Sequence, residues 1–225
     1  MSAPDLRIVD DPATEVAALL DEAAEAGGHV VLTGGSSPKR AYELAAERDV
    51  DWSRATVWFG DERCVAPEHP DSNFGMADGA LLSRLSRPPD VLRMEGELGP
   101  EAGAGNYEAQ VRERLGGEPR WDLLLLGLGP DAHCASLFPS KPEKDETSRL
   151  VIGVPEAGMA PQVPRISLTI PALNAARRVV FLITGENKRE AVRRAFVDAD
   201  ETSPAARVRP PAGELVVLLD SAAAP

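Results

Sequence analysis

The sequence predicts an α/β protein whose mostly parallel sheet is flanked by helices on both faces. Segments with strand-like composition alternate along the chain with segments of helical periodicity, as in parallel sheets with helical crossovers. The run Leu123–Leu126 is apolar at every position, which is typical of a strand buried on both faces. A second largely apolar run, Val179–Thr184, is followed by Gly185 and another helical pattern.

The expected elements follow from apolar periodicity and from the positions of proline and glycine. Pro12 and Pro38 suit the first turns of two helices, and Gly116 and Gly117 suit the end of a third over 101–115. Further helical segments are expected over 74–85 and 188–196, and a short turn or helix over 171–176. Strands are expected over 6–9, 29–33, 55–59, 91–94, 123–126, 150–154, 166–170, 179–184 and 214–219, and loops over 140–148 and 204–211.

Length and composition favour one globular domain. The 225 residues could form one large α/β domain or two small ones. No internal repeat, low-complexity tract or convincing linker interrupts the chain. We therefore expect a single domain over residues 1–225, with a monomer as the default state.

The charge and cysteine content exclude several classes of partner. The net charge is −12, whereas nucleic-acid and anionic membrane surfaces need a basic face. An anionic ligand would therefore need a local cluster of Arg or Lys. Two cysteines without metal-ligand spacing favour free thiols and no metal site. The chain begins without a signal-peptide pattern and has no apolar run near the ~20 residues of a membrane span, so we expect a cytoplasmic protein.

The loop after Leu123–Leu126 contains the strongest catalytic candidate. Gly127, Gly129 and Pro130 end the strand, and Asp131 and His133 follow directly. Ligands of open parallel sheets bind at the carboxyl ends of the strands. An imidazole there can accept or donate a proton near neutral pH. A histidine that only packs in the loop is the alternative.

Two other strand ends carry candidate binding residues. The turn Gly34-Gly35-Ser36 lies between an expected strand and a helix, an arrangement that directs backbone N–H groups at an anion. It matches no dinucleotide or Walker pattern, and a plain turn explains it equally well. Asp61 and Arg63 follow the next strand; Arg63 suits phosphate or carboxylate, but a solvated turn with an ion pair is equally consistent.

Five blocks of the sequence together resemble 6-phosphogluconolactonases, and they occur in that family's order over nearly the whole chain. They are LTGGSSPKRAYELAA, VWFGDERCVAPEHPDSNFGMADGALLS, WDLLLLGLGPDAHCASLFP, RISLTIPALNAARRVVFLITGENKREAV and PAARVRP. The resemblance implies a Rossmann-like parallel sheet of the lactonase and sugar-phosphate-isomerase type. It also implies hydrolysis of a phosphorylated sugar lactone, 6-phosphoglucono-δ-lactone, in the oxidative pentose phosphate pathway, without metal or organic cofactor.

The resemblance assigns roles to individual residues. His133 matches the catalytic histidine, expected to activate water and then protonate the leaving ring oxygen, and Asp131 matches the acidic residue that holds it. Arg63 and Lys188 are assigned to the phosphate, and backbone N–H groups of the glycine turn to the oxyanion. The substrate-binding set is Gly34, Gly35, Ser36, Asp61, Arg63, Asn73, Arg165 and Lys188.

The sequence departs from the family pattern at a few positions. Cys134, Ser37 and Ser167 stand where threonine is usual, and Ala132 stands where glycine is usual. If the backbone at Ala132 needs a positive φ, alanine is strained there and could misaim His133.

Three other functions remain open from the sequence. A glucosamine-6-phosphate deaminase or isomerase is the nearest rival, although Asn is typical there at the position of Asp131. A non-catalytic sugar-phosphate sensor is motivated by Ala132. A Ser–His–Asp hydrolase is disfavoured because no G-x-S-x-G elbow precedes a helix.

Overall fold

The computed structural model describes residues 3–116 and 118–225. Met1, Ser2 and Gly117, the second of the two glycines expected to end a helix, lie outside the described residues. Gly116 does end that helix, with a positive φ of 79°.

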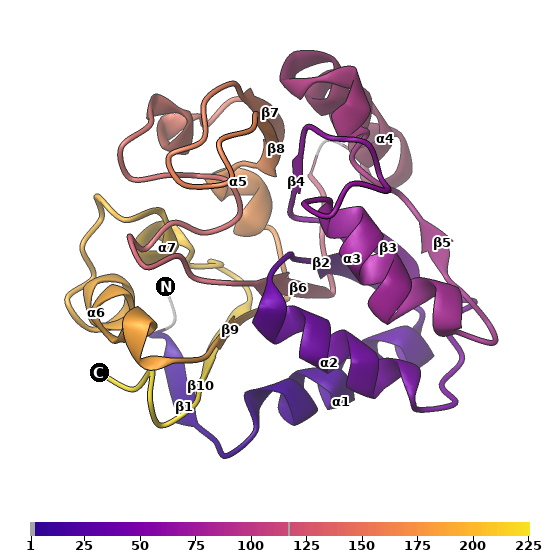
Figure 1. Cartoon of the computed structure of the whole chain (residues 1–225), viewed down its shortest axis with the longest axis horizontal. Coiled ribbons are helices and arrows are strands. Elements are labelled where there is room, and N and C mark those ends of the chain that lie inside the picture. Colours follow the sequence, from indigo (N-terminus) through magenta and orange to yellow (C-terminus); the bar gives the residue numbers. More distant parts are fainter. Residues whose placement is uncertain (1–2, 117) are drawn as a thin grey trace.

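Seven strands form one sheet in which every neighbouring pair is parallel (Figure 1). In order across the sheet they are β1 (Asp5–Ile8), β10 (Glu214–Leu219), β9 (Arg178–Ile183), β6 (Leu123–Leu126), β2 (His29–Leu32), β3 (Thr56–Phe59) and β5 (Asp90–Val91). The prediction of a mostly parallel sheet is confirmed. The run Leu123–Leu126 forms the central strand, and all four of its residues are buried.

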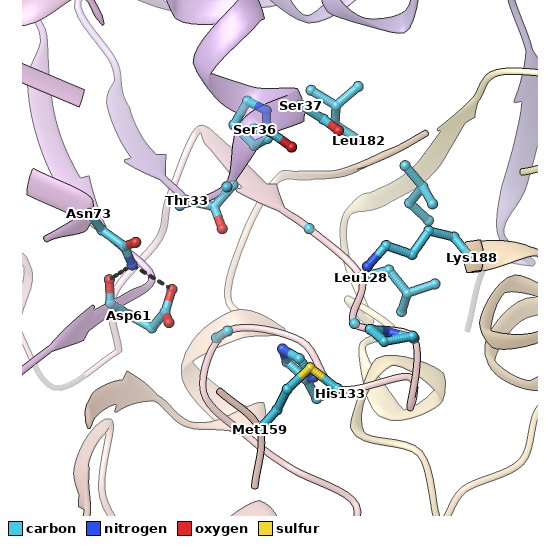
Figure 2. A pocket seen from close by; sticks show the side chains of 18 of the residues that line it. Thr33, Ser36, Ser37, Asp61, Asn73, Leu128, His133, Met159, Leu182 and Lys188 are labelled. Atoms are coloured by element: carbon cyan, nitrogen blue, oxygen red, sulfur yellow. Dashed lines mark hydrogen bonds between the residues drawn. The ribbon is translucent and has the colours of Figure 1, made fainter. Parts of the chain in front are cut away.

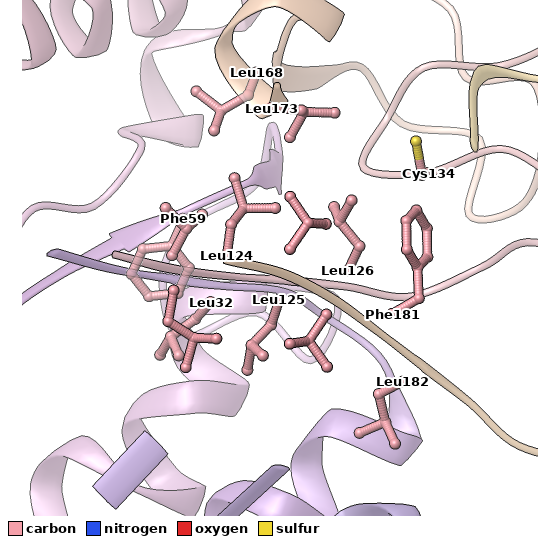
Figure 3. Packing of buried hydrophobic residues seen from close by; sticks show 14 of the residues in the cluster. Leu32, Phe59, Leu124, Leu125, Leu126, Cys134, Leu168, Leu173, Phe181 and Leu182 are labelled. Atoms are coloured by element: carbon pink, nitrogen blue, oxygen red, sulfur yellow. The ribbon is translucent and has the colours of Figure 1, made fainter. Parts of the chain in front are cut away.

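Both faces of this sheet are covered, which explains why β6 is apolar throughout. Successive side chains of a strand point to opposite faces. Figure 3 shows Leu124 on one side of the sheet with Leu168 and Leu173, and Leu125 on the other side with Leu182. Helices α1 (Pro12–Ala26) and α2 (Ser36–Ala46) pack together and contact β9. These two helices therefore cover one face of the main sheet, as expected.

A second, three-stranded antiparallel sheet packs beside the main one. It consists of β4 (Asp61–Arg63), β8 (Arg165–Leu168) and β7 (Val151–Val154), and α4 (Pro100–Leu115) contacts β7 and β8. Strands near 150–154 and 166–170 were expected, but not their separate sheet. The interpretation of 61–63 as a solvated turn is wrong, because Asp61 and Glu62 are only 6% and 2% exposed.

The remaining elements are short. Helix α3 (Asn73–Ala80) is followed by a 3₁₀ turn, so the helix expected over 74–85 is divided. The region 188–196 is likewise a succession of 3₁₀, α and π turns. Two expected loops contain helical turns: 204–211 includes α7 (Pro204–Arg207), and 140–148 includes a 3₁₀ turn. These turns and the remaining short helical elements are η1 (Leu82–Arg84), η2 (Gly96–Leu98), η3 (Pro142–Asp145), α5 (Ile170–Leu173), η4 (Glu186–Lys188), α6 (Arg189–Val192) and η5 (Arg193–Val197).

The strand order changes direction between β2 and β6. From β2 the chain adds β3 and then β5 toward one edge, returns to place β6 on the other side of β2, and continues outward with β9 and β10. Loops that leave β2 and β6 therefore diverge to opposite sides, and a crevice opens between them at the carboxyl ends of the strands. This topology predicts the location of a ligand site.

One contiguous hydrophobic core runs through the main sheet and its covering layers. We propose on this basis that the described residues form a single domain. Within residues 3–116 and 118–225, none of the helices combines the length and the apolar composition needed to cross a membrane.

Removing one buried leucine from the central strand should destabilise the fold strongly. Leu125 is 1% exposed, so Leu125→Ala should lower the free energy of unfolding by about 2–5 kcal/mol through lost burial and an unfilled cavity. Leu98→Ala is the matched control, because Leu98 is 47% exposed and its truncation should cost about 0.5 kcal/mol or less. Urea unfolding of both variants measures the difference; equal losses would contradict the predicted core.

Candidate active site

A pocket occupies the crevice between the ends of β2 and β6. Its floor and sides come from the turn after β2, the loop after β6, strands β4 and β8, and the segment after β9. Figure 2 shows Ser36 and Ser37 of the first turn, His133 of the β6 loop and Lys188 around the same space, with Asp61 on the other side from Lys188.

His133 is held in this pocket by Asp131. The imidazole Nδ1 lies 2.6 Å from Asp131 Oδ1, and the same oxygen accepts the backbone N–H of His133 at 3.2 Å. Burial by itself raises the pKa of Asp131, but the hydrogen bond and the charge of His133 outweigh it, so this pKa lies below its ordinary value. Asp131 is therefore ionised at neutral pH. Since a carboxylate only accepts hydrogen bonds, Nδ1 is the donor, and in the neutral form of the imidazole Nε2 carries the free lone pair.

The loop leaves space for this pair only because residue 129 is glycine. A Cβ at Gly129 would collide with the imidazole of His133 and crowd the carboxylate of Asp131. The backbone N–H of Gly129 donates to the carbonyl of His133 at 2.9 Å, and the ring of His133 packs on Phe138 with centroids 4.7 Å apart. The histidine thus sits in a short, tightly closed loop.

Ala132 has a positive φ of 68°, the conformation in which an alanine at this position is strained. A left-handed conformation costs a non-glycine residue about 1–2 kcal/mol. The conformation is retained because the Ala132 N–H donates to Gly129 and its carbonyl accepts from Ser203 and from the N–H of Ala205. In this conformation the imidazole of His133 keeps its 2.6 Å contact with Asp131.

The turn after β2 presents an uncapped helix start to the pocket. Gly35, with φ of 111°, precedes α2, and no side chain caps the helix. The first N–H groups of a helix have no intrahelical acceptor, and together with the helix dipole they favour an anion. The Ser37 and Thr184 hydroxyl oxygens are 2.6 Å apart and tie this turn to the end of β9.

Three cations line the pocket without an ion-paired carboxylate in the part of the chain that the structure describes: Arg63, Arg165 and Lys188. Arg165 is 4% exposed, and burial lowers its pKa, with neighbouring Asp61 opposing. Burial also lowers the pKa of Lys188, and Asp131 opposes this. Because burying unpaired cations is unfavourable, this arrangement suits an anionic ligand that pairs with them.

Asn73 connects two walls of the pocket. Its side-chain amide donates to the Asp61 carbonyl at 2.8 Å and lies 3.3 Å from the Asp61 carboxylate (Figure 2). On its other side it lies against the turn after β2, where a Cβ at Gly34 would collide with the Asn73 amide. The other oxygen of Asp61 accepts from Ser136 at 2.7 Å.

The structure brings the predicted site residues together. Every one of them lines the pocket except Asp131, which lies behind His133. The sequence analysis missed residues contributed by neighbouring segments, for which it had no spacing signal. They are Thr33, Leu128, Ala135, Met159, Leu182, Ile183 and Thr184. Among the described residues, no group of three or more His, Cys, Asp or Glu side chains is placed to hold a metal ion.

Comparison with known families agrees with this geometry. The family model described as "Glucosamine-6-phosphate isomerases/6-phosphogluconolactonase" matches residues 6–217. The chain belongs to this family. It is 43% identical over 219 residues to the 6-phosphogluconolactonase of Streptomyces coelicolor, covering 90% of this chain and 83% of that protein. It is 39% identical over 213 residues to that of Nostoc sp., covering 91% and 87%.

Solved structures of family members share the fold. The 6-phosphogluconolactonase of Thermotoga maritima superposes with a TM-score of 0.85 at 30% identity, over 97% of this chain and 100% of that one. A monomeric glucosamine-6-phosphate deaminase superposes with a TM-score of 0.79 over 97% and 98%, at 18% identity. The second comparison shows the shared fold alone.

Removing His133 should raise the pKa of Asp131. Its hydrogen bond and positive charge lower that pKa, so His133→Ala leaves burial, which acts in the opposite direction. Carboxyl ¹³C NMR titration of Asp131 measures the change, and His69→Ala is the control because His69 lies in a separate loop beside Asp71. An unchanged Asp131 titration in His133→Ala would show that the pair is not coupled.

Proposed function

We propose that this protein hydrolyses 6-phosphoglucono-δ-lactone to 6-phosphogluconate in the oxidative pentose phosphate pathway, with His133 as general base and acid. The supporting observation is the Asp131–His133 pair, which faces a pocket lined by unpaired cations. Relatives that cover most of the chain at about 40% identity are 6-phosphogluconolactonases. The reaction needs one proton-transfer group near the lactone carbonyl and an anion site for the phosphate, and we assign these roles to His133 and to the cations of the pocket.

The hydrogen bond to Asp131 prepares His133 for the first step. With the proton on Nδ1, Nε2 can take a proton from water as the water oxygen attacks the lactone carbonyl carbon. The resulting imidazolium is stabilised by the Asp131 carboxylate. The π electrons of the lactone carbonyl move to the carbonyl oxygen, so the carbonyl group becomes a tetrahedral intermediate with a negatively charged oxygen. Backbone N–H groups near Gly34 and Gly35 are candidate hydrogen-bond donors to this oxyanion.

The second step returns the proton. When the oxyanion collapses, the bond between the carbonyl carbon and the ring oxygen breaks, and the electron pair leaves with the ring oxygen. The His133 imidazolium protonates that oxygen, which becomes a hydroxyl group of the open product. One water is consumed, the histidine returns to its starting state, and the new acid ionises in solution.

The phosphate is proposed to bind between Lys188 and Arg63, with Arg165 as a further donor. Arg63 and Lys188 line the pocket without an ion-paired carboxylate among the described residues, so a phosphate would supply the missing negative charge. Binding energy from this remote group orients the carbonyl against His133.

The deaminase and sensor functions are less well supported. A glucosamine-6-phosphate deaminase shares the fold, but the relatives with about 40% identity are 6-phosphogluconolactonases. Ammonia release from glucosamine 6-phosphate is the assay that discriminates between the two activities. The sensor hypothesis rested on a misaimed His133, and the imidazole retains its contact with Asp131 despite the φ of Ala132.

A monomer is proposed as the active unit. The steps proposed above use only side chains and backbone groups of this pocket and Asp131 behind it. The net charge of −12 supports a small-molecule substrate rather than a nucleic acid.

Loss of His133 should abolish most of the catalysis while preserving the fold. General acid–base assistance is typically worth about 10²–10⁴-fold, so kcat of His133→Ala should fall by about that factor. Acid release from freshly generated lactone, corrected for spontaneous hydrolysis, provides the measurement. His69→Ala should retain wild-type turnover. A fully active His133→Ala enzyme would exclude the proposed role.

Lys188 should give product binding a distinctive alkaline limit. An ordinary lysine has a pKa of ~10.4. Burial lowers the pKa of Lys188, so its ammonium loses its charge at a lower pH than that of an ordinary lysine. Affinity for 6-phosphogluconate should therefore fall as pH rises through this lowered pKa. Lys188→Ala should weaken binding by about tenfold or more, because a charge-assisted hydrogen bond is lost.

Calorimetric titration with 6-phosphogluconate over a series of pH values tests this expectation. Lys188→Arg should retain binding at alkaline pH, since a guanidinium stays charged. Lys141→Ala is a control, because Lys141 pairs with Glu156 away from the pocket. A wild-type alkaline limit that persists in Lys188→Arg would assign the titration to another group.

A further inference from the structure

Strand β4 and the start of α3 are interlocked by hydrogen bonds from three consecutive residues. On one side of Glu62, the Asp61 carbonyl accepts from the Asn73 side chain at 2.8 Å. On the other side, Arg63 Nη1 donates to the Asp71 carbonyl at 2.6 Å. Glu62 lies between these contacts, and its side chain is the centre of the interlock.

The Glu62 carboxylate accepts four hydrogen bonds. Oε1 accepts from the N–H groups of Arg63 and Asn73 at 2.6 and 2.7 Å. Oε2 accepts from the Phe74 N–H at 2.7 Å and from the Ser72 hydroxyl at 3.1 Å. Since α3 begins at Asn73, this carboxylate satisfies two N–H groups that a helix start leaves without acceptors.

This carboxylate is unusual because it is buried without a cationic partner. Glu62 is 2% exposed and forms no ion pair in the described part of the chain. Burial raises its pKa, and the hydrogen bonds from Phe74, Asn73 and Arg63 act against this. A buried charge persists only where its surroundings compensate it, so the four donors and the positive end of α3 must keep their positions around it.

Those positions determine the shape of the pocket. The backbone N–H of Asn73 donates to the Glu62 carboxylate, which fixes the position of Asn73. The side-chain amide of Asn73 in turn lies against Gly34 at the proposed anion-binding turn. Arg63 is held at its backbone by Glu62 and at its guanidinium by Asp71. A shift at Glu62 therefore moves one wall of the pocket, whereas the imidazole of His133 is held by Asp131 within its own loop.

We propose that Glu62 is a positioning residue for substrate binding, acting through Asn73 and Arg63 rather than by touching the substrate. The proposal rests on the lactonase function proposed above. The alternative is that Glu62 only caps α3, so that its loss would reduce stability without affecting the pocket.

The test is Glu62→Gln, which preserves size but replaces one accepting oxygen with an NH₂ group that faces N–H donors. KM for the lactone should rise by about tenfold, while kcat should stay within about twofold, because a binding wall and not the proton-transfer group is disturbed. Asp11→Asn is the matched control: Asp11 accepts the N–H groups of Ala13 and Thr14 at the start of α1, outside the pocket. It should lose stability and retain both kinetic constants.

A double-variant cycle with Asn73→Ala tests the route of the effect. If part of the effect passes through Asn73, adding Glu62→Gln to Asn73→Ala should raise KM by less than it does in the wild type, and the remaining increase is the part that passes through Arg63. Effects that multiply in the double variant would overturn the route through Asn73. An unchanged KM in a destabilised but folded Glu62→Gln enzyme would overturn the proposal altogether.

A second substitution covers the case in which Glu62→Gln does not fold. Glu62→Asp retains the charge and both acceptors but withdraws them by one methylene, so it should raise KM in the same direction with kcat preserved. Wild-type turnover is measured in parallel. Absence of lactonase activity in the folded wild type would reject the proposed function, whereas normal wild-type kinetics with an unchanged Glu62→Asp KM would reject the role of Glu62.

Discussion

The reversal of strand order between β2 and β6 is the constraint on which the site depends. Because both strands are parallel and adjacent, their carboxyl ends lie at the same edge of the sheet, and their loops diverge on opposite sides. The anion-favouring turn at Gly34 and the His133 loop therefore face one another across the crevice. The second sheet closes the crevice from the side with Asp61, Arg63 and Arg165.

Cations that are buried without ion-paired carboxylates among the described residues are gathered in this crevice, where their desolvation is unfavourable. An overall charge of −12 would repel an anionic substrate from most of the surface, so attraction must come from local cations. Arg165 and Lys188 are partly or largely desolvated without ion-paired carboxylates in the described structure, and their pKa values are lowered accordingly. A bound phosphate would relieve this cost, since it supplies the missing negative charge. The same unfavourable charges thus become a source of affinity.

The catalytic loop combines backbone strain with firm support. Ala132 is held in the left-handed region by contacts to Gly129, Ser203 and Ala205, and the absence of a side chain at Gly129 admits the imidazole beside Asp131. The wall formed by β4 follows a related principle, because the buried Glu62 carboxylate persists only with its donors in place. In both cases an unfavourable local state is retained by tertiary hydrogen bonds.

The sequence by itself predicted the parallel α/β class and the central buried strand Leu123–Leu126, and its resemblance to a known family assigned the residues of the candidate site. These features are local: apolar runs, glycine breaks and short motifs are legible without knowing the fold. Only the tertiary structure decided that Asp61–Arg63 forms a strand of a second sheet, and that Glu62 is buried there. The partners of Glu62 lie 10 to 12 residues away at Ser72, Asn73 and Phe74, so no periodicity within either segment could reveal the contact.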